Sequence, residues 1–477
     1  MFTTAELFGP FHSPKPRLKE ARDKFTGLPI NELQDLLGPG LPTHLLSPTE
    51  EGPFSRERVY SLAVTFWTFL WQVLNPGSSC REAVRKLRAW FRLLGLPKVS
   101  ADDSPYCQAR QRLPKETLQR FLKASAQSAE QGGRTAWRFH GRLVQVGDGT
   151  SCDAPDTAAN QRAYPQYKKQ KPGCGFPSVR IVGLFSLATG ALLALATGNK
   201  HQAELRLFRK IWDEIKSGDI FLADRGFCDF VTLAWLRRRG ADVVVRLHGT
   251  RNHDLRQGKS VGKYERRVTW AKPPRKPKTA TRKIWRALPR EITLRLIRYP
   301  VQVPGFRPKR IVLVTTLLDP IAYPAAELAQ LYLRRWRVEV FWGKIKGSLQ
   351  MDMLSCKTPA MIYREILFHM IAYNLIRRLM VEAANIYDLD VARFSFKGTM
   401  DTLRQFSLVI IQAKNRRKKL LLLNDLLSVL AEDPLPDRPD RVEPRVQKRR
   451  PKAYPFMVQP RQVLKAKILK NRKYKGA

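Results

Sequence analysis

Apolar residues recur at helical spacing through the first part of the chain. From Ser55 to about Gln131 they return every three or four residues, which is the period of a helix with one buried face. The pattern predicts helices over Ser55–Leu74, Ser79–Leu94, Pro105–Leu113 and Lys115–Gln131. A short helix is also expected near Pro29–Leu37, in a stretch rich in Pro and Gly. We therefore expect residues 1–135 to form an N-terminal, mainly helical domain.

From Arg142 the helical period gives way to short apolar runs separated by glycine turns. The runs are RLVQVGDGT, VRIVGLFSLATG and ALLALATGNK. A helix (Gln202–Ile215), the strand DIFLADRG, a second helix (Asp229–Arg239) and the strand ADVVVRLHG follow. Strands that then alternate with helices predict an α/β sheet with helices packed on it. This first part of the α/β core is assigned to residues 136–249.

A basic segment interrupts the alternation at residues 250–290, which hold 14 Lys and Arg against two acids. Strand-like runs return at EITLRLIRYPVQV and RIVLVTTLLD. We therefore expect residues 250–322 to form a basic, β-rich insertion in the α/β core.

A long helix is predicted over Pro324–Leu349, and further helices extend the helical pattern over residues 323–432. Residues 433–477 are expected to be a basic, flexible tail. From Arg441 to the end the chain holds 13 Lys and Arg against the single acid Glu443. Such a segment is typically disordered alone and ordered on nucleic acid.

The charge of the chain narrows its function more than its hydrophobic content does. Lys and Arg number 86 against 41 Asp and Glu, which gives a formal net charge of +45 spread over every segment. The simplest partner is a polyanion, with nucleic acid favoured over a membrane surface. The longest apolar stretch, Ser61–Leu74, is too short to span a bilayer, and the N-terminus lacks signal-peptide order. These features predict a cytoplasmic, nucleoid-associated protein with no membrane contact.

The cysteines form no C-x-x-C pair. We therefore expect reduced thiols in a cytosolic protein, not a zinc site or a disulfide framework. The six positions are Cys80, Cys107, Cys152, Cys174, Cys228 and Cys356.

Two short basic helices, SCREAVRKLRAWFRLLG and SPYCQARQRL, are joined by a turn. They suit a helix-turn-helix-like DNA reader, but basic amphipathic helices are also common as plain solvated faces. Both readings stay open on the sequence.

Two aspartates follow apolar alternation that is typical of buried strands. In LVQVGDGT the residues Val144, Val146 and Asp148 lie on one side of a strand, and Asp224 ends DIFLAD in the same way. Each aspartate is expected at a strand end, where α/β sheets gather active groups. Taken singly, Asp-Gly is also an ordinary turn signal and Asp-Arg an ordinary ion pair.

A glutamate lies among cations and tyrosine in YLRRWRVEVFWGKIK. On a regular α-helix Tyr332, Arg335, Glu339 and Lys346 fall within an arc of roughly 60°. With Asp148 and Asp224 on strand ends, Glu339 could hold two divalent cations about 4 Å apart. Mg²⁺ suits such oxygen ligands, and Arg335, Lys346 and Tyr332 would hold a DNA backbone in register. The spacing alone also fits a surface ion pair between Arg335 and Glu339.

The motifs together resemble bacterial insertion-sequence transposases of the DDE class, in the group with a Tyr-x2-Arg-x3-Glu-x6-Lys signature. Tyr332, Arg335, Glu339 and Lys346 match all four signature positions. The blocks DGT at Asp148, LADRGF at Asp224 and TTLLDPIAYPAAELAQLYLRRWRVE are also similar to family blocks. The resemblance covers roughly residues 75–430.

The resemblance implies an α/β, ribonuclease-H-like core interrupted by a β-rich insertion, with an N-terminal helical domain and C-terminal helices. The N-terminal domain, residues 1–135, is then expected to bind DNA ends. It implies that Asp148, Asp224 and Glu339 are the catalytic triad and bind two Mg²⁺ ions, for which Mn²⁺ can substitute. The gap of 115 positions from Asp224 to Glu339 accommodates the insertion. The expected enzyme binds double-stranded DNA at terminal inverted repeats as a homodimer and catalyses DNA cleavage and strand transfer into target DNA.

Two other functions stay open. A transposase-derived DNA-binding protein would bind ends without cutting them. A ribonuclease or junction nuclease on the same fold would cut without regard to transposon-end sequence.

Several aromatic residues are ambiguous on the sequence. Family members can stack a flipped base on an aromatic of the insertion, but no spacing selects Trp270 or Trp285 over a buried structural role. Trp336 and Trp342 are equally plausible as core residues of the long helix. His201, ahead of a helix, is expected to be a cap or a core residue.

Overall fold

The computed structural model describes residues 37–38, 40–47, 59–93, 95–249, 257–301, 309–410, 413, 415–436 and 456–470. The short helix expected near Pro29–Leu37 lies almost wholly outside these residues. So do residues 55–58 and most of the basic tail.

Four N-terminal helices form where the periodicity of the sequence predicts them, although the first begins at Leu62 and residues 59–61, which the prediction from Ser55 includes, are not helical. They are α4 (Leu62–Leu74), α5 (Cys80–Leu93), α6 (Ser104–Arg112) and α7 (Lys115–Gln131). Helix α4 begins at Leu62 because the Ser61 hydroxyl accepts a hydrogen bond from the Val64 amide (3.3 Å), a typical N-cap contact. Ten of its 13 residues are buried, so α4 is an internal helix of this region.

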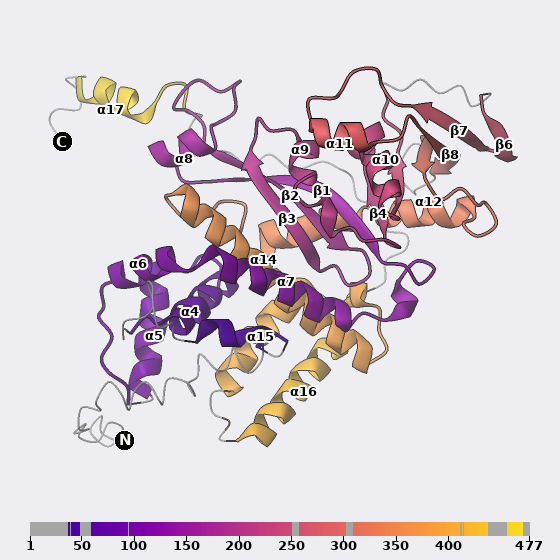
Figure 1. The fold of residues 1–477 in the computed structure, drawn as a ribbon. Coiled ribbons are helices and arrows are strands. Elements are labelled where there is room, and N and C mark those ends of the chain that lie inside the picture. The colour runs from indigo at the N-terminus through magenta and orange to yellow at the C-terminus, as the bar shows by residue number, and fades with distance from the viewer. Residues whose placement is uncertain are drawn as a thin grey trace.

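Helices from the two ends of the chain pack together in the lower half of Figure 1. The C-terminal helices are α14 (Pro359–Ile386), α15 (Phe396–Ile410) and α16 (Arg416–Glu432). Phe66 of α4, Phe121 of α7 and Phe368 of α14 form one aromatic cluster, with ring centroids 4.4 and 5.2 Å from Phe66. Helix α14 therefore contacts both the N-terminal helices and the sheet.

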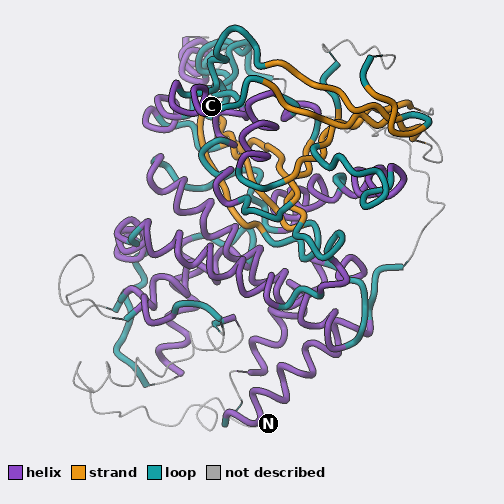
Figure 2. Tube along the Cα trace, turned by 45° about the vertical axis from the view of Figure 1, so that its right-hand side comes forward, coloured by secondary structure: helices purple, strands orange, loops and turns teal. Residues whose placement is uncertain are grey.

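One mixed sheet makes the other half of the molecule (Figure 2). Its first five strands are β1 (Val144–Asp153), β2 (Ser178–Ser186), β3 (Leu192–Asn199), β4 (Ile220–Ala223) and β5 (Asp242–Arg246). They lie in the order β3-β2-β1-β4-β5. Strands β1, β2 and β3 form an antiparallel meander, and β4 and β5 continue parallel to β1.

The basic insertion extends this same sheet. Its strands are β6 (Lys259–Gly262), β7 (Glu265–Ala271), β8 (Glu291–Val301) and β9 (Lys309–Thr315), with helix α11 (Arg282–Ala287) between β7 and β8. Strand β9 pairs antiparallel with β5, which gives nine strands in the order β3-β2-β1-β4-β5-β9-β8-β7-β6. The insertion is thus β-rich, as its sequence predicts.

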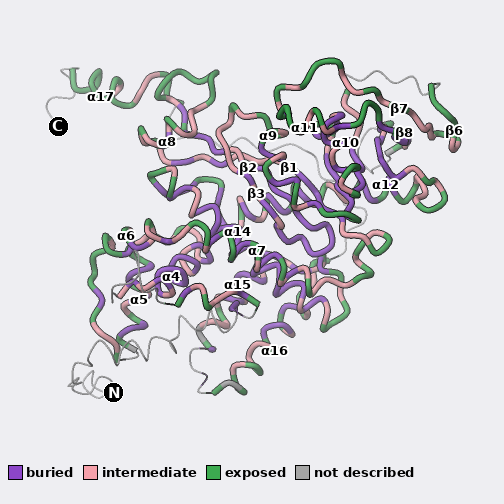
Figure 3. Tube along the Cα trace, in the orientation of Figure 1, coloured by how far each residue is buried: buried purple, intermediate pink, exposed green. Residues whose placement is uncertain are grey.

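Apolar side chains cover both faces of the central strands. Along β4, Ile220 and Leu222 join the large core that contains α4, α7 and α14. The alternate residues Phe221 and Ala223 join a second core against α10 (Phe230–Arg238). A strand buried on both faces reads as a continuous apolar run, which accounts for IFLA. Figure 3 shows this burial through the sheet and α14.

The helix expected over Gln202–Ile215 is shorter in the structure. It consists of α9 (Glu204–Phe208) and a 3₁₀ turn at Trp212–Glu214. The amides of Lys210 and Ile211 bond to carbonyls three residues back, at 2.9 Å each. Arg209, the residue after α9, pairs with Asp229 (2.9 Å), the N-cap of α10.

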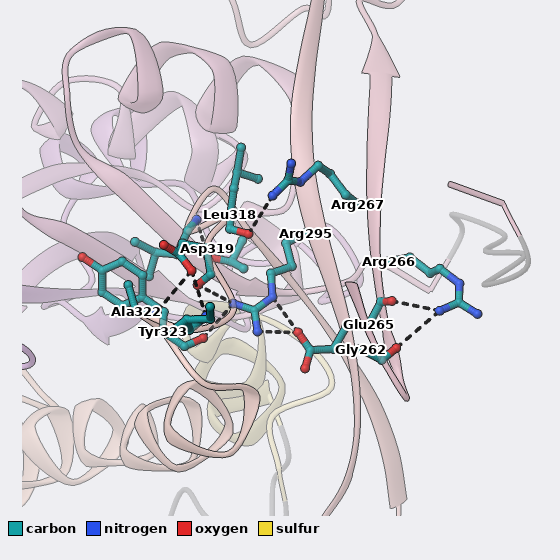
Figure 4. Close-up of polar contacts among 12 residues, drawn as sticks. Gly262, Glu265, Arg266, Arg267, Arg295, Leu318, Asp319, Ala322 and Tyr323 are labelled. Atoms are coloured by element: carbon teal, nitrogen blue, oxygen red, sulfur yellow. Dashed lines mark hydrogen bonds and ion pairs between the residues drawn. The ribbon is translucent and has the colours of Figure 1, made fainter. Parts of the chain in front are cut away.

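A buried arginine ties the insertion to the segment that leads into helix α12 (Ala325–Arg334). Arg295 of β8 is fully buried and pairs with Glu265 of β7 through its Nε (2.7 Å). Its Nη1 donates to the carbonyls of Asp319 (3.2 Å) and Tyr323 (2.7 Å), and Figure 4 shows these contacts. The loop before α12 is therefore fixed by the insertion.

In the tail, the residues that the structure describes include the exposed helix α17 (Arg461–Lys470). The flexibility of residues 433–477 stays a prediction. No helix among the described residues has both the length and the apolar character needed to cross a bilayer.

Candidate active site

Asp148 lies where the parallel pairing of two buried strands ends. Strand β1 pairs with β4 from Val144–Ile220 to Gly147–Ala223. The sequence prediction that Asp148 closes its strand is wrong, because β1 continues to Asp153 by pairing with β2 on its other side. Relative to β4, however, Asp148 is the first residue beyond the pairing, and its side chain is half-buried.

Asp224 follows directly after β4, at the same end of the parallel pair. Continuing the register by one residue places Asp224 opposite Asp148, with about 5 Å between the two backbones. The Asp224 Oδ1 accepts a hydrogen bond from the Gly226 amide (2.7 Å), which caps a 3₁₀ turn at Arg225–Phe227. The sheet therefore brings together two aspartates that are 76 positions apart in the sequence.

Glu339 comes from helix α13 (Arg337–Gly343), which packs on the sheet beside these strands. Trp342 and Phe341 contact Phe185 of β2, with ring centroids 5.0 and 5.6 Å apart. An added Cβ at Gly183 would lie 2.9 Å from the Trp342 ring, so glycine is what allows α13 to approach β2 so closely. Glu339 itself is on the exposed side of α13.

Arg335 connects the two parts of the site. Its Nη2 donates to the Glu339 Oε1 at 3.2 Å, so the ion pair that the spacing allows is present. The Arg335 charge also acts on Asp148 and lowers the pKa of that carboxyl group. Arg335 therefore lies within electrostatic reach of both Glu339 and Asp148.

The carboxyl group of Asp148 is difficult to ionise without a cation. Burial raises the pKa of Asp148 to about 7, and the charges of Asp224 and Glu204 add to the rise. The Gly149 amide and Arg335 act in the opposite direction. A bound divalent cation would favour the ionised carboxylate, so this environment fits a metal site.

Glu204 is a neighbour of Asp148 that the sequence pattern missed. It is the first residue of α9, and an added Cβ at Gly149 would lie 2.9 Å from its carboxyl group. No spacing signal links positions 148 and 204, because the contact arises only when β3 leads the chain back to α9. The local charge is therefore more negative than the three predicted carboxylates alone would make it.

The donor set at this site consists of oxygens, which suits Mg²⁺ or Mn²⁺. The carboxylate oxygens of Asp148, Asp224 and Glu339 do not all lie within 4.8 Å of one another. Two cations about 4 Å apart can be held by carboxylates with a wider separation than one cation requires. The pair of ions that the sequence predicts stays a prediction.

The regular helix from which a single stripe of Tyr332, Arg335, Glu339 and Lys346 is expected is interrupted in the structure. The helix predicted over Pro324–Leu349 is divided into α12, α13 and a π-helical turn at Lys344–Ser348. At the junction of α12 and α13 the amides bond three residues back, as from Arg335 to Tyr332 (3.1 Å). Tighter and wider turns shift the residues away from the positions that a regular helix gives.

The signature residues consequently have different environments. Tyr332 is buried, and its ring centroid is 5.9 Å from the Arg335 guanidinium carbon. Lys346 pairs with Asp352 (3.0 Å), and its charge lowers the pKa of Cys152 and Asp153 against burial, which raises both. Lys346 therefore lies near the end of β1, past Asp148.

The four tryptophans considered in the sequence differ in burial. Trp342 is core, whereas Trp336 is 49% exposed. Trp270 and Trp285 are half-buried and pack against the second core, and Lys272 Nζ lies 4.7 Å from the Trp285 ring centroid. His201 is exposed in a turn, where its amide donates to Asn199 (3.1 Å), so the expected core or cap role is wrong.

Part of the chain matches a described protein family. Residues 139–375 match the family described as "Transposase DDE domain". The matched range contains β1, β4 and α13, and with them Asp148, Asp224 and Glu339.

Among curated proteins, the chain is similar to "Transposase InsG for insertion sequence element IS4" of Escherichia coli (strain K12). The two are 27% identical over 434 residues, which are 90% of this chain and 94% of that protein. The chain thus carries a DDE transposase domain over residues 139–375, which makes it an enzyme of the DDE transposase class and a distant homologue of that transposase.

Proposed function

We propose that this enzyme binds the terminal inverted repeats of an insertion sequence, cleaves DNA there and transfers the freed strand into target DNA. The observation that carries the proposal is the register of β1 and β4, which brings Asp148 beside Asp224. Arg335 connects this pair to Glu339. Two adjacent aspartates, and a glutamate paired with an arginine whose charge also acts on Asp148, suit metal-dependent phosphodiester chemistry on a basic protein.

The sheet order supports a ribonuclease-H-like core. An antiparallel meander, β3-β2-β1, is followed by the parallel strands β4 and β5. The two aspartates lie on adjacent central strands, and the third acid comes from a helix on one face. The strands of the insertion then continue this core at its β5 edge.

Asp148, Asp224 and Glu339 would hold two Mg²⁺ ions, or Mn²⁺ in their place. Ions bound there would activate the attacking oxygen and stabilise the leaving one. In the first step a water oxygen bonds to phosphorus, the bond from phosphorus to the 3′ oxygen breaks, and that oxygen leaves as a 3′-hydroxyl. In the second step the oxygen of that 3′-hydroxyl bonds to a target phosphorus, the bond from this phosphorus to the target's own 3′ oxygen breaks, and that oxygen leaves as a 3′-hydroxyl. The protein positions the reactants and forms no covalent intermediate.

The other signature residues, Arg335, Lys346 and Tyr332, are proposed to contact DNA. Arg335 and Lys346 are paired with Glu339 and Asp352 in the free protein and would turn to phosphates when DNA binds. Tyr332, which is buried beside Arg335, would orient that guanidinium and contact DNA only through its edge. Binding two ends together would require a homodimer, with α5 and α6 as candidate readers of the end sequence.

The test is cleavage of a labelled duplex that carries the inverted repeat flanking the gene, in the presence of Mg²⁺. We expect cuts at the repeat boundary with 3′-hydroxyl products, and none with Asp224→Asn. Binding without cleavage by the wild-type protein would instead identify a transposase-derived DNA-binding protein. Equal cleavage of a scrambled duplex would identify a nuclease that ignores end sequence.

A further inference from the structure

A second group of metal-binding side chains lies far from the carboxylates in sequence. Cys80 is the first residue of α5, Cys107 lies in α6, and Asp103 is the N-cap of α6. One ligand atom from each lies within 4.8 Å of the other two, and this is the one such group of His, Cys, Asp and Glu among the described residues. All three residues are half-buried, so a small ion could reach them.

The local structure sets this geometry. Asp103 and Cys107 are four positions apart, and the Cys107 amide donates to the Asp103 carbonyl (2.9 Å), so both side chains lie on one face of the first turn of α6. Gln72 of α4 donates from Nε2 to the Cys80 sulfur (3.9 Å). Three helices therefore converge on the group.

A buried polar network supports the position of Gln72. Its Oε1 accepts hydrogen bonds from the Tyr106 hydroxyl (3.0 Å) and from Arg110 Nη1 (3.2 Å). Arg110 in turn lies over the Phe69 ring, 4.6 Å from its centroid. The side chain that orients Cys80 is thus held by contacts of its own, as partners of metal ligands commonly are.

We propose that Cys80, Asp103 and Cys107 bind one Zn²⁺ ion, with water as the fourth ligand. Two Zn–S bonds of about 2.3 Å in a tetrahedral site place the sulfurs about 3.8 Å apart, which is inside the observed separation limit. Each thiol releases its proton to solvent on binding. Two thiolates, one carboxylate and one Zn²⁺ leave a net charge of −1, which the nearby Arg110 offsets.

The softness of the ligands separates this site from the active site. Thiolates favour Zn²⁺, whereas the all-oxygen set of Asp148, Asp224 and Glu339 favours Mg²⁺. The sequence does not predict this site, because its two cysteines come from different helices, lie 27 positions apart and form no C-x-x-C pair. A bound ion would fasten α5 to α6, the pair of helices proposed to read DNA ends.

The test uses the full-length reduced protein in excess Mg²⁺, titrated with Co²⁺ and then with Zn²⁺. We expect one equivalent of Co²⁺ to give a thiolate-to-cobalt charge-transfer band, which Zn²⁺ then abolishes. Cys80→Ser and Cys107→Ser should each weaken binding by more than the roughly 10- to 100-fold that loss of a ligand's hydrogen-bond partner costs. Asp103→Asn should weaken binding and keep the band. Cys174→Ser, at an equally half-buried cysteine outside the group, is the matched control and should bind as the wild type does.

A measurement on the unmutated protein keeps the test independent of variant folding. Zn²⁺ should protect Cys80 and Cys107 from alkylation, as mapped by peptide mass, and leave the labelling of Cys174 unchanged. Equal labelling of Cys80 and Cys107 with and without Zn²⁺ would overturn the proposal. Formation of a Cys80–Cys107 disulfide under mild oxidation, without any cobalt band in the reduced protein, would overturn it in favour of a redox pair.

Discussion

At the scale of single residues, Asp148 combines burial with two acidic neighbours, Asp224 and Glu204, and one cation, Arg335. Its ionised form is unfavourable when no metal ion is bound, because the desolvation and the like charges outweigh the single cation. The free protein therefore loses stability at this position in order to keep a carboxylate available for a cation.

The first prediction follows from this pKa. Because the folded-state pKa of Asp148 is about 7 and the ordinary pKa of an aspartate is 3.8, its contribution to stability is fully present at low pH. The contribution is lost as pH rises from about 4 through 7. Asp148→Asn should therefore raise the free energy of unfolding of the metal-free protein at pH 8 by on the order of 2 kcal/mol.

Denaturant unfolding in the presence of a chelator measures this difference. The gain should shrink toward zero as pH falls to about 4, where the folded wild-type protein holds Asp148 protonated. A variant that is less stable than the wild type at pH 8 would contradict the assignment.

The second prediction separates catalysis from binding. Glu339→Gln keeps the size of the side chain and removes its charge, so cleavage of a transposon-end duplex in Mg²⁺ should fall by roughly 100-fold or more. DNA binding should hold or tighten, because a negative charge near phosphate is removed and Arg335 is released. Gel-shift and cleavage assays on the same duplex measure both effects.

Glu327→Gln is the matched control, since Glu327 lies on α12 and pairs with His140 at 2.7 Å. Its loss should cost under about 1 kcal/mol of stability and leave cleavage intact. Wild-type cleavage by Glu339→Gln would make Glu339 a surface ion-pair partner only. Lys346→Ala should lower binding and cleavage together.

At the scale of elements, the sequence predicts strands and helices well and their junctions poorly. The alternation around Asp148 and Asp224 predicts the two buried strands, because a strand buried on both faces leaves a clear apolar record. It places Asp224 directly after its strand, but it does not reveal that β1 continues past Asp148 to Asp153. The division of the helix predicted over Pro324–Leu349 into α12, α13 and a π-helical turn has no counterpart in the apolar pattern of the sequence. Hydrogen bonds to the third or fifth residue arise where α13 must bring Trp342 onto Phe185, and that packing depends on β2, about 150 positions earlier.

The third prediction concerns the link between β8 and the loop before α12. Arg295→Met removes the cation that pairs with the largely buried Glu265 carboxylate and donates to the Tyr323 carbonyl. The Asp319 carbonyl also loses this donor but keeps the Tyr323 amide (3.1 Å). Breaking such a pair on one side costs about 3–5 kcal/mol. We expect a loss of this size in urea unfolding, together with reduced cleavage because the support of α12 and α13 loosens.

Arg298→Met, on the same strand but half-buried, serves as the control and should cost under about 1 kcal/mol. Equal losses of stability in the two variants would show that any arginine-to-methionine change in β8 destabilises the strand. The loss of stability in Arg295→Met would then not be due to the contacts of Arg295.

At the scale of the whole molecule, the net charge of +45 opposes compaction and attracts polyanions. Some of the described acids pair with cations, as in Arg142–Asp242 (2.7 Å) and Arg209–Asp229 (2.9 Å), but Lys and Arg outnumber the acids of the whole sequence by 45. The excess cations therefore remain available for phosphate along the insertion, α13 and the tail.

The fourth prediction is a change in salt dependence when residues 441–477 are removed. For each phosphate that the shortened protein no longer neutralises, the slope of log affinity against log salt should fall by about 0.9. The tail carries 13 Lys and Arg, so a reduction of several units is expected. Fluorescence anisotropy with an end duplex measures it, and an unchanged slope would mean that the tail does not touch DNA.

The continuity of the nine-stranded sheet limits how this enzyme can be rearranged. Strand β9 forms hydrogen bonds with the edge of β5. Excising residues 250–322 would leave that edge of β5 unpaired, next to the strands β1 and β4 that carry the candidate site. A bare, apolar edge recruits other chains. The insertion is therefore no detachable module: a minimal or chimeric version of the enzyme must keep β8 and β9, or supply another strand in their place, to stay monodisperse.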